Sequence, residues 1–404
     1  MKSVGAALGA AAACAAASAH AEDLRFDFAG FVQTEARAFF EPPQFTRQTS
    51  QRLGLSVAVQ PELRVDAGDF RFTLVPFARW DSIEKGAYGG RTRADLREAN
   101  IFYQSADWDL TVGLAKVFWG RAESENIVDI VNQTDFAEDS DGDEKLGQPM
   151  VQFNYLTDIG QVGLFVMPGF RDRTFVDGRN RNGFALPVDA DDPDFEAGAG
   201  RWHPDLAFAY SHFIDEFDFR VSHFYGHSRE PRLVQTPGAD GPKLVPAYDL
   251  IHQTGVDGQA TLGPALWKLE AIHRRGQGDP FFATVAGVEY TLFSFADGRG
   301  DLGLIAEHLY DGRDDDAPTT IFDNDLFLGA RYAFNDVSDT EILGGGVVDL
   351  ENGATALSLE FETRLFDNWS IEADARGFVA IPDDDPLSAS ERDSVLQIRL
   401  NRFF

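Results

Sequence analysis

The feature that most constrains the fold is an alternation of apolar and polar residues, which is clearest between residues 52 and 65. One side of this stretch carries Leu53, Leu55, Val57, Val59, Leu63 and Val65. The other side carries Arg52, Ser56, Gln60, Glu62 and Arg64. A period of two places successive side chains on opposite faces of a β-strand. The stretch therefore predicts a strand with one apolar face and one polar face.

Composition decides which kind of β-protein this pattern favours. The chain has 35 Phe, 9 Tyr and 6 Trp beside a charged fraction of 25%. After residue 21 no run of about 18 or more apolar residues offers a membrane-spanning helix. Abundant aromatic residues interleaved with charge are typical of a closed barrel that meets lipid outside and water inside. A large soluble β-sandwich or propeller remains an open alternative.

The connections between the expected strands differ in length in a regular way. Tight turns are expected at 66–69, 105–108, 157–160, 214–217, 262–265, 297–300, 335–339 and 366–368. Longer polar segments alternate with them at 41–51, 81–92, 119–148, 171–203, 228–249, 311–321 and 381–392. Short periplasmic turns and long extracellular loops are the signature of an outer-membrane barrel. We predict an all-β, transmembrane, antiparallel up-and-down barrel of about 18 strands, with 16 left open.

The two ends of the chain favour export to the outer membrane. Lys2, the apolar residues 4–17 and Ala19-His20-Ala21 form a pattern typical of a cleaved signal peptide, so we expect a signal over 1–21 and the barrel over 22–404. Acylation of Cys14 in a lipoprotein signal is the open alternative. Phe404 follows a strand that alternates over 396–401, and this ending resembles the sorting signal that the barrel-assembly machinery reads.

The segment 119–148 is the third long connection, and it is the one place where helix-like spacing occurs. Ile127, Val128, Ile130 and Val131 recur as on one side of a short helix. We expect this side to lie against the barrel wall while the acidic side faces the pore, so that the third outer loop bends inward as a constriction. An ordinary surface loop is the alternative. The expected constriction residues are Trp119, Arg121, Glu123, Glu125, Asp129, Asn132 and Asp135.

Inward positions on the expected strands carry many charges of both signs. A mixed wall of this kind produces a transverse field that orients dipolar solutes. The alternative is a set of solvated cross-strand pairs that have no role in selectivity. The wall residues that we expect to border the lumen are Arg64, Arg71, Arg79, Arg97 and Glu98.

The third loop also carries a resemblance. Trp-Gly-Arg-Ala-Glu-Ser at 119–124 and Val-Asp-Ile-Val-Asn-Gln-Thr-Asp at 128–135, with Leu-Arg-Glu-Ala at 96–99, resemble an uncharacterised family of proteobacterial porin-like outer-membrane barrels. More distantly, they are similar to alginate-export barrels. The resemblance spans 96–135 and implies a location and an architecture, without a substrate. The sequence lacks the dense basic channel that export of an acidic polysaccharide would need.

Charge and motifs narrow the function further. The formal net charge of −31 excludes a nucleic-acid partner, which requires a basic surface. The strand histidines are scattered, and no HExxH or GxSxG motif occurs, so we expect no enzyme, no metal and no cofactor. A barrel phospholipase whose Ser and His come from separate strands stays a minor alternative.

We expect an outer-membrane porin-like channel for passive diffusion of small hydrophilic solutes. The alternative is an export conduit or a lipid-transfer partner of a periplasmic or inner-membrane pump. The expected partners are outer-membrane lipid and lipopolysaccharide, the barrel-assembly machinery, the diffusing solutes and, if the barrel oligomerises, further copies of this chain.

Overall fold

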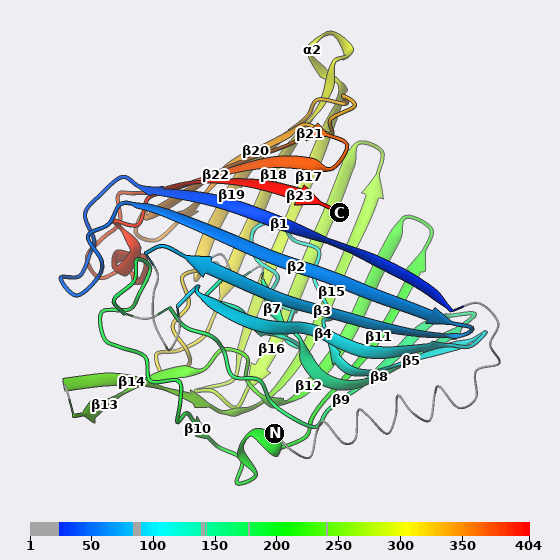
Figure 1. Cartoon of the computed structure of the whole chain (residues 1–404), viewed down its shortest axis with the longest axis horizontal. Helices are drawn as coiled ribbons and strands as arrows, with labels where there is room; N and C mark the ends of the chain where they lie inside the picture. The colour runs from blue at the N-terminus through cyan, green and yellow to red at the C-terminus, as the bar shows by residue number, and fades with distance from the viewer. Residues whose placement is uncertain (1–23, 84–89, 139–141, 143, 177, 240) are drawn as a thin grey trace.

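The computed structural model describes residues 24–404, except 84–89, 139–141, 143, 177 and 240. The expected signal peptide therefore lies outside the described residues. The chain forms a closed antiparallel sheet of 18 strands (Figure 1). These strands are β1 (Arg25–Phe39), β2 (Leu53–Ala67), β3 (Phe70–Asp81), β4 (Arg93–Gln104), β5 (Trp108–Ala115), β8 (Gln148–Thr157), β9 (Gly160–Met167), β11 (Asp205–Ile214), β12 (Phe217–His227), β15 (Leu250–Leu262), β16 (Ala265–Arg275), β17 (Phe281–Ser294), β18 (Gly300–Asp311), β19 (Asn324–Ala333), β20 (Glu341–Asp349), β21 (Thr355–Phe366), β22 (Trp369–Val379) and β23 (Val395–Phe403).

The topology is up-and-down, because each barrel strand pairs with the barrel strand that follows it in the chain. The first and last strands close the barrel in a register that runs from Phe31 opposite Phe403 to Phe39 opposite Val395. Closure leaves the sheet without a free edge. The predicted barrel is confirmed, and the strand count is 18 rather than 16.

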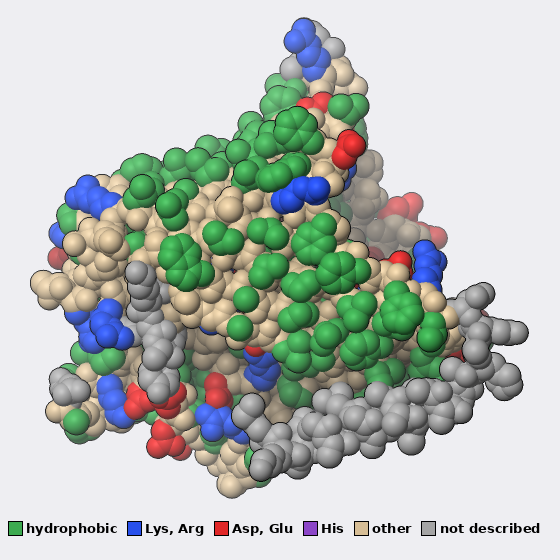
Figure 2. Space-filling model, viewed as in Figure 1, with side chains coloured by type: hydrophobic (Ala, Val, Ile, Leu, Met, Phe, Trp, Pro, Cys, Tyr) green, Lys and Arg blue, Asp and Glu red, His purple; other side chains and the backbone are tan. Residues whose placement is uncertain are grey.

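The alternation of residues in the sequence corresponds to the outer and inner faces of the barrel wall. On β2, Leu53, Leu55 and Val57 are exposed on the outer surface, whereas the intervening Gly54 and Ser56 are buried. Figure 2 shows hydrophobic side chains spread over the outer face of β1 to β4. No helix of the described residues is both long and apolar enough to cross a membrane.

The two ends of the barrel differ as expected. At one end, here called the turn end, several hairpins are closed by two residues, and Gly68, Asp215 and Gly263 adopt the positive φ that such turns require. The hairpin β17–β18 closes instead through the short helix α2 (Phe295–Gly298). At the opposite end, here called the loop end, most connections are long. The connection between β16 and β17 is an exception, because it spans only 276–280.

The loops at the loop end fold over the mouth of the barrel and carry two small sheets. One sheet joins β6 (Gln133–Thr134) to β7 (Lys145–Leu146), and the other joins β10 (Asp194–Phe195), β14 (Gly241–Tyr248) and β13 (Arg232–Gly238). Two 3-10 helices lie at Gly200–Trp202 (η1) and Pro386–Ser390 (η2). The buried Arg181 of the fourth loop binds Asp393 of the last loop and the carbonyl of Glu41 in the first. This contact ties three loops together across the mouth.

Candidate functional site

The third loop, residues 116–147 between β5 and β8, enters the barrel and packs against its inner wall. Trp119, Val128, Ile130 and Val131 are buried in one apolar cluster. The cluster takes its other members from eight consecutive barrel strands, at Ala115, Met150, Phe165, Met167, Ala207, Ala209, Phe224, Ile251, Ile272, Phe281 and Ala283. In the structure the apolar side of the loop thus lies against the inner wall of the barrel.

The expected helix in this loop is wrong. Residues 116–132 are irregular and contain only a turn at 127–128. A helix would pair backbone N–H groups with carbonyls of its own previous turn. Here the N–H groups of Arg121, Ala122 and Val128 are directed instead at a carboxylate of the wall. The wall thus satisfies donors that a helix would have satisfied internally.

Two buried glutamates of the wall hold the loop in this position. Glu270 of β16 accepts hydrogen bonds from the N–H groups of Arg121 at 2.5 Å and Ala122 at 3.0 Å. Glu307 of β18 accepts from the N–H of Ser124 at 2.8 Å and from its hydroxyl at 2.6 Å. Charge-assisted hydrogen bonds of this kind are about twice as strong as neutral ones. The carboxylates of Glu270 and Glu307 therefore fix the loop in the lumen. The sequence did not indicate this role for either residue.

Arg121 and Glu123 form ion pairs with the wall. The guanidinium of Arg121 lies 2.8 Å from Asp218 and 3.2 Å from Asp257. The carboxylate of Glu123 lies 2.7 Å from Arg331 of β19. Both side chains thus bind strands β12, β15 and β19 and reinforce the hold of the two glutamates.

Three other predicted residues hold the loop together internally. The side chain of Asp129 is buried, accepts a hydrogen bond from the N–H of Trp119 and lies 3.4 Å from Lys145. The side-chain amide of Asn132 donates to the carbonyls of residues 115 and 146, where the two legs of the loop meet the barrel. Asp135 binds Arg93 of β4 and the hydroxyl of Thr174 at 2.7 Å. Through these contacts, Asp129, Asn132 and Asp135 stabilise the folded conformation of the loop.

Two of the predicted wall residues contact the returning leg of the loop. Arg79 is 6% exposed, and its guanidinium lies 2.6 Å from Glu138. Arg97 is equally buried, pairs with Glu144 and stacks over the ring of Phe77 at 4.0 Å. The second leg of the loop is thus bound to β3 and β4, just as the first leg is bound to β15, β16, β18 and β19.

The remaining predicted wall residues lie away from these contacts. Arg64 pairs with Glu62, and Arg71 lies 2.7 Å from Asp66, both near the turn end. Glu98 accepts a hydrogen bond from the amide of Asn100 at 3.3 Å. The structure therefore does not join all five predicted wall residues into one site.

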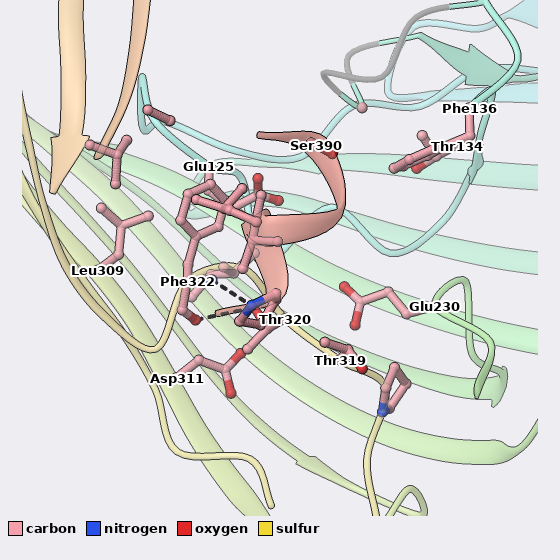
Figure 3. Close-up of a pocket in the computed structure, with 18 of the residues that line it drawn as sticks. Glu125, Thr134, Phe136, Glu230, Leu309, Asp311, Thr319, Thr320, Phe322 and Ser390 are labelled. Carbon is pink, nitrogen blue, oxygen red and sulfur yellow. Dashed lines mark hydrogen bonds between the residues drawn. The ribbon is translucent and has the colours of Figure 1, made fainter. Parts of the chain in front are cut away.

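The loop divides the lumen and leaves a cavity of about 1290 Å³ at the loop end. Glu125 and Ile127 of the third loop line one side of it, while the opposite side is formed by strands β17 to β23. Figure 3 shows Glu125, Phe322 and Ser390 of η2 gathered around this space, with Glu230 and Asp311 at its margin. Of the predicted constriction residues, Glu123, Glu125, Asp129 and Asn132 border the cavity.

Nearer the turn end than the cavity, three neighbouring strands carry acidic residues in direct opposition. Glu341 of β20 is opposite Glu362 of β21, and Glu362 is opposite Glu372 of β22. Glu360 is likewise opposite Asp374. Like charges that face each other directly destabilise a sheet. In this acidic row, defined as Glu341, Glu362 and Glu372, two members have arginine partners, because Arg331 lies 3.2 Å from Glu341 and Arg399 lies 3.3 Å from Glu372.

Glu230, in the fifth loop, is a carboxylate held between two arginines. Its carboxylate lies 2.7 Å from Arg274 and 3.1 Å from Arg313. Burial alone would raise the pKa of Glu230, but these two guanidinium groups hold it well below its ordinary value. A lowered pKa stabilises the folded state above the ordinary pKa, and this contribution is lost as the pH falls.

We therefore expect hydrogen–deuterium exchange over 228–249, corrected for its intrinsic pH dependence, to accelerate in the wild type below about pH 4. Glu230→Gln should exchange faster at neutral pH and lose most of this acid response. Identical pH profiles in the two proteins would contradict the role of Glu230.

Comparisons with known proteins concern the fold. No protein-family model matches the chain, and no curated protein does. Among solved structures, Wzi of Escherichia coli, described as a carbohydrate-binding outer-membrane β-barrel involved in group 1 capsule assembly, aligns over 92% of this chain and 83% of its own with a TM-score of 0.51 and 10% identity. The fold is that of an outer-membrane β-barrel.

A second structure, Pseudomonas putida OprB, aligns over 94% of both chains with a TM-score of 0.48 and 13% identity. Identities this low carry over no functional residue. The resemblance of residues 96–135 to a porin-like family, and the more distant similarity to alginate-export barrels, thus stay predictions.

Proposed function

We propose that this protein is an outer-membrane channel through which small hydrophilic solutes diffuse passively. The observation that carries the proposal is on β21. Leu357 and Leu359 point outward and are exposed, and the alternate residues Glu360 and Glu362 point inward and are also exposed. Charged side chains are tolerated at membrane depth where they line a water-filled cavity. An aqueous path along β20 to β22, beside the third loop, accounts for this pattern.

In this proposal the third loop narrows the channel, and the acidic row selects among ions. Glu123 pairs with Arg331, and Asp129 is buried beside Lys145, so their charges are largely compensated. The acidic row lies on the inner face of β20 to β22, where Glu362 is exposed, and fixed charge on a pore wall sets the local potential. The channel is therefore expected to prefer cations.

Planar-bilayer recordings of the refolded protein test this selectivity. In a salt gradient, the wild type should give a reversal potential of the sign for cation preference. Replacing Glu341, Glu362 and Glu372 with Gln should shift it toward zero or beyond. The control replaces Asp107, Asp215 and Glu216 at the turn end with their amides, which removes the same charge from a site outside the acidic row.

Each outcome has a distinct meaning. An equal shift in both triple variants would show that net charge, and not the acidic row, sets selectivity. The absence of current at any voltage, with the barrel verified as folded, would overturn the channel itself.

The alternative of a lipid-transfer or export conduit predicts a different lining. Passage of lipid needs a continuous apolar path, whereas the acidic row on β20 to β22 interrupts the apolar wall. The polar lining supports a solute channel over lipid transfer. A role as a conduit for a periplasmic pump would be recognised by binding of a periplasmic protein at the turn end.

Export and assembly belong to the same proposal. Phe404 packs against Phe28 with ring centroids 5.6 Å apart, and its N–H donates to the carbonyl of Gly30. We assign Phe404 to the sorting signal, and a cleaved signal over 1–21 would direct the chain to the outer membrane. Lipopolysaccharide would surround the loop end. Self-association remains part of the proposal.

A further inference from the structure

Three possible metal ligands meet at the rim of the barrel, outside the lumen described above. His203 ends the fourth loop, Asp205 begins β11, and His227 ends β12. One ligand atom from each lies within 4.8 Å of the others. His203 Nδ1 is 3.2 Å from Asp205 Oδ1, and His227 Nδ1 is 3.6 Å from the same oxygen.

The environment of His227 is unusual for a polar side chain. It is completely buried, and neither ring nitrogen has a hydrogen-bond partner among the residues that the structure describes. The separation of 3.6 Å from Asp205 is too long for a hydrogen bond. The rings of Phe170, Phe195 and His203 lie within 5.5 Å of the His227 ring, centroid to centroid. A buried imidazole without a partner is costly unless something binds it.

We propose that His203, Asp205 and His227 bind a divalent transition-metal ion of the zinc class. Two imidazole nitrogens and one carboxylate oxygen form a donor set that suits such ions. Tetrahedral coordination with metal–ligand bonds of about 2.0–2.1 Å places donor atoms roughly 3.3 Å apart. The separations of 3.2 and 3.6 Å lie close to this value. The ligand atoms of His203 and His227 lie within 4.8 Å of each other.

The neighbouring charges assign separate roles to the two oxygens of Asp205. Oδ2 accepts a hydrogen bond from Arg229 at 2.8 Å, and Arg229 also donates to the carbonyls of Val131 and His227. Oδ1 faces the histidines. Arg229 orients the carboxylate as an outer-shell partner, although its charge lowers the affinity for a cation. Selectivity therefore depends on the imidazoles, which favours zinc over calcium or magnesium.

Metal binding here would join a loop to the barrel wall. His203 belongs to the fourth loop, whose Arg181 contacts the first and last loops across the mouth, whereas Asp205 and His227 belong to barrel strands. The ion would thus fix one end of the loop that crosses the mouth. This role is independent of which solute the channel conducts.

Zinc binding to the refolded, tag-free full chain in detergent tests the site, by competition with a chromogenic chelator. We expect one zinc ion per chain and no comparable binding of calcium. His203→Gln should weaken zinc binding by at least roughly tenfold. His203 is the preferred position because its side chain is 17% exposed, whereas the buried His227 is harder to replace without disturbing folding.

The matched control replaces His223 and His252, a pair with ring nitrogens 3.4 Å apart and with no carboxylate between them in the described structure, by Gln. This variant should bind zinc as the wild type does. A cobalt(II) complex provides a second readout, because its visible absorption reports coordination and should disappear in His203→Gln. Zinc binding that survives His203→Gln, or that is lost only with His223 and His252, would overturn the proposal. So would the absence of zinc binding by a wild-type barrel whose folding is verified by its migration before and after heating.

Discussion

Deletion of residues 123–133 is expected to raise the single-channel conductance roughly twofold or more, because conductance grows with the open cross-section at the narrowest point. These residues lie inside the lumen and carry Val128 and Val131, which are completely buried against the wall. The measurement is a conductance histogram from planar bilayers. The variant should also admit larger neutral sugars in a liposome-swelling assay.

A milder variant tests the same point without shortening the chain. Glu270→Gln and Glu307→Gln together weaken the charge-assisted hydrogen bonds that hold residues 121–124. We expect a larger mean conductance with more frequent fluctuations, since the loop is then released from one wall. The control carries the same two changes at Glu62 and Glu216, near the turn end. If neither the deletion nor the double variant alters conductance, the third loop does not limit the pore.

The second large effect is expected from Glu35→Gln, which should lower the free energy of unfolding by about 3–5 kcal/mol. Glu35 is 4% exposed and lies within 3.5 Å of guanidinium groups of Arg37, Arg79, Arg91 and Arg399. Removing one partner from a buried ionic cluster leaves uncompensated charge. Here the four arginines would lose the one carboxylate that they share.

Equilibrium unfolding in urea from lipid vesicles measures this effect. The control is Glu62→Gln, because Glu62 pairs with Arg64, whose side chain is 53% exposed, and exposed pairs contribute only about 0–1 kcal/mol. A Glu35→Gln barrel as stable as the control would contradict the structural role of the arginine cluster. Since Arg79 also binds Glu138 of the third loop, a change in conductance should accompany the loss of stability.

Much of the fold was predictable because successive side chains of a barrel strand point outward and inward in turn, so that apolar and polar residues alternate in the sequence. The alternation over 53–65 predicted β2, and the unequal connections predicted which barrel end carries the long loops. The inward course of 119–148 was predictable from its apolar residues. Its conformation was not, because a spacing of three and four suits any segment that buries one side.

The partners of charged residues were beyond sequence reasoning for a physical reason. Arg121 contacts Asp257, and Ser124 contacts Glu307, only because the sheet closes into a barrel. The local sequence pattern does not show which strands lie opposite the third loop after closure. In the sequence, Glu270 and Glu307 cannot be distinguished from other glutamates that occupy inward positions on a strand. The cluster of His203, Asp205 and His227 could not be predicted for the same reason, because His227 lies on a different strand. The His-x-Asp spacing at 203–205 was the one signal in the sequence.

The separation of contacts along the chain implies an order of assembly. The N–H of Arg121 binds a carboxylate 149 residues later, that of Ser124 binds one 183 residues later, and Gln33 binds Asn401 across a separation of 368. Contacts between distant parts of a chain form slowly, because the intervening chain must be ordered first. The first leg of the third loop therefore lacks the two carboxylates that accept its N–H groups until β16 and β18 are in place. A chain arrested before β16 would lack Ile272, Phe281 and Ala283 of the apolar cluster, so it would leave the apolar residues of the loop partly uncovered.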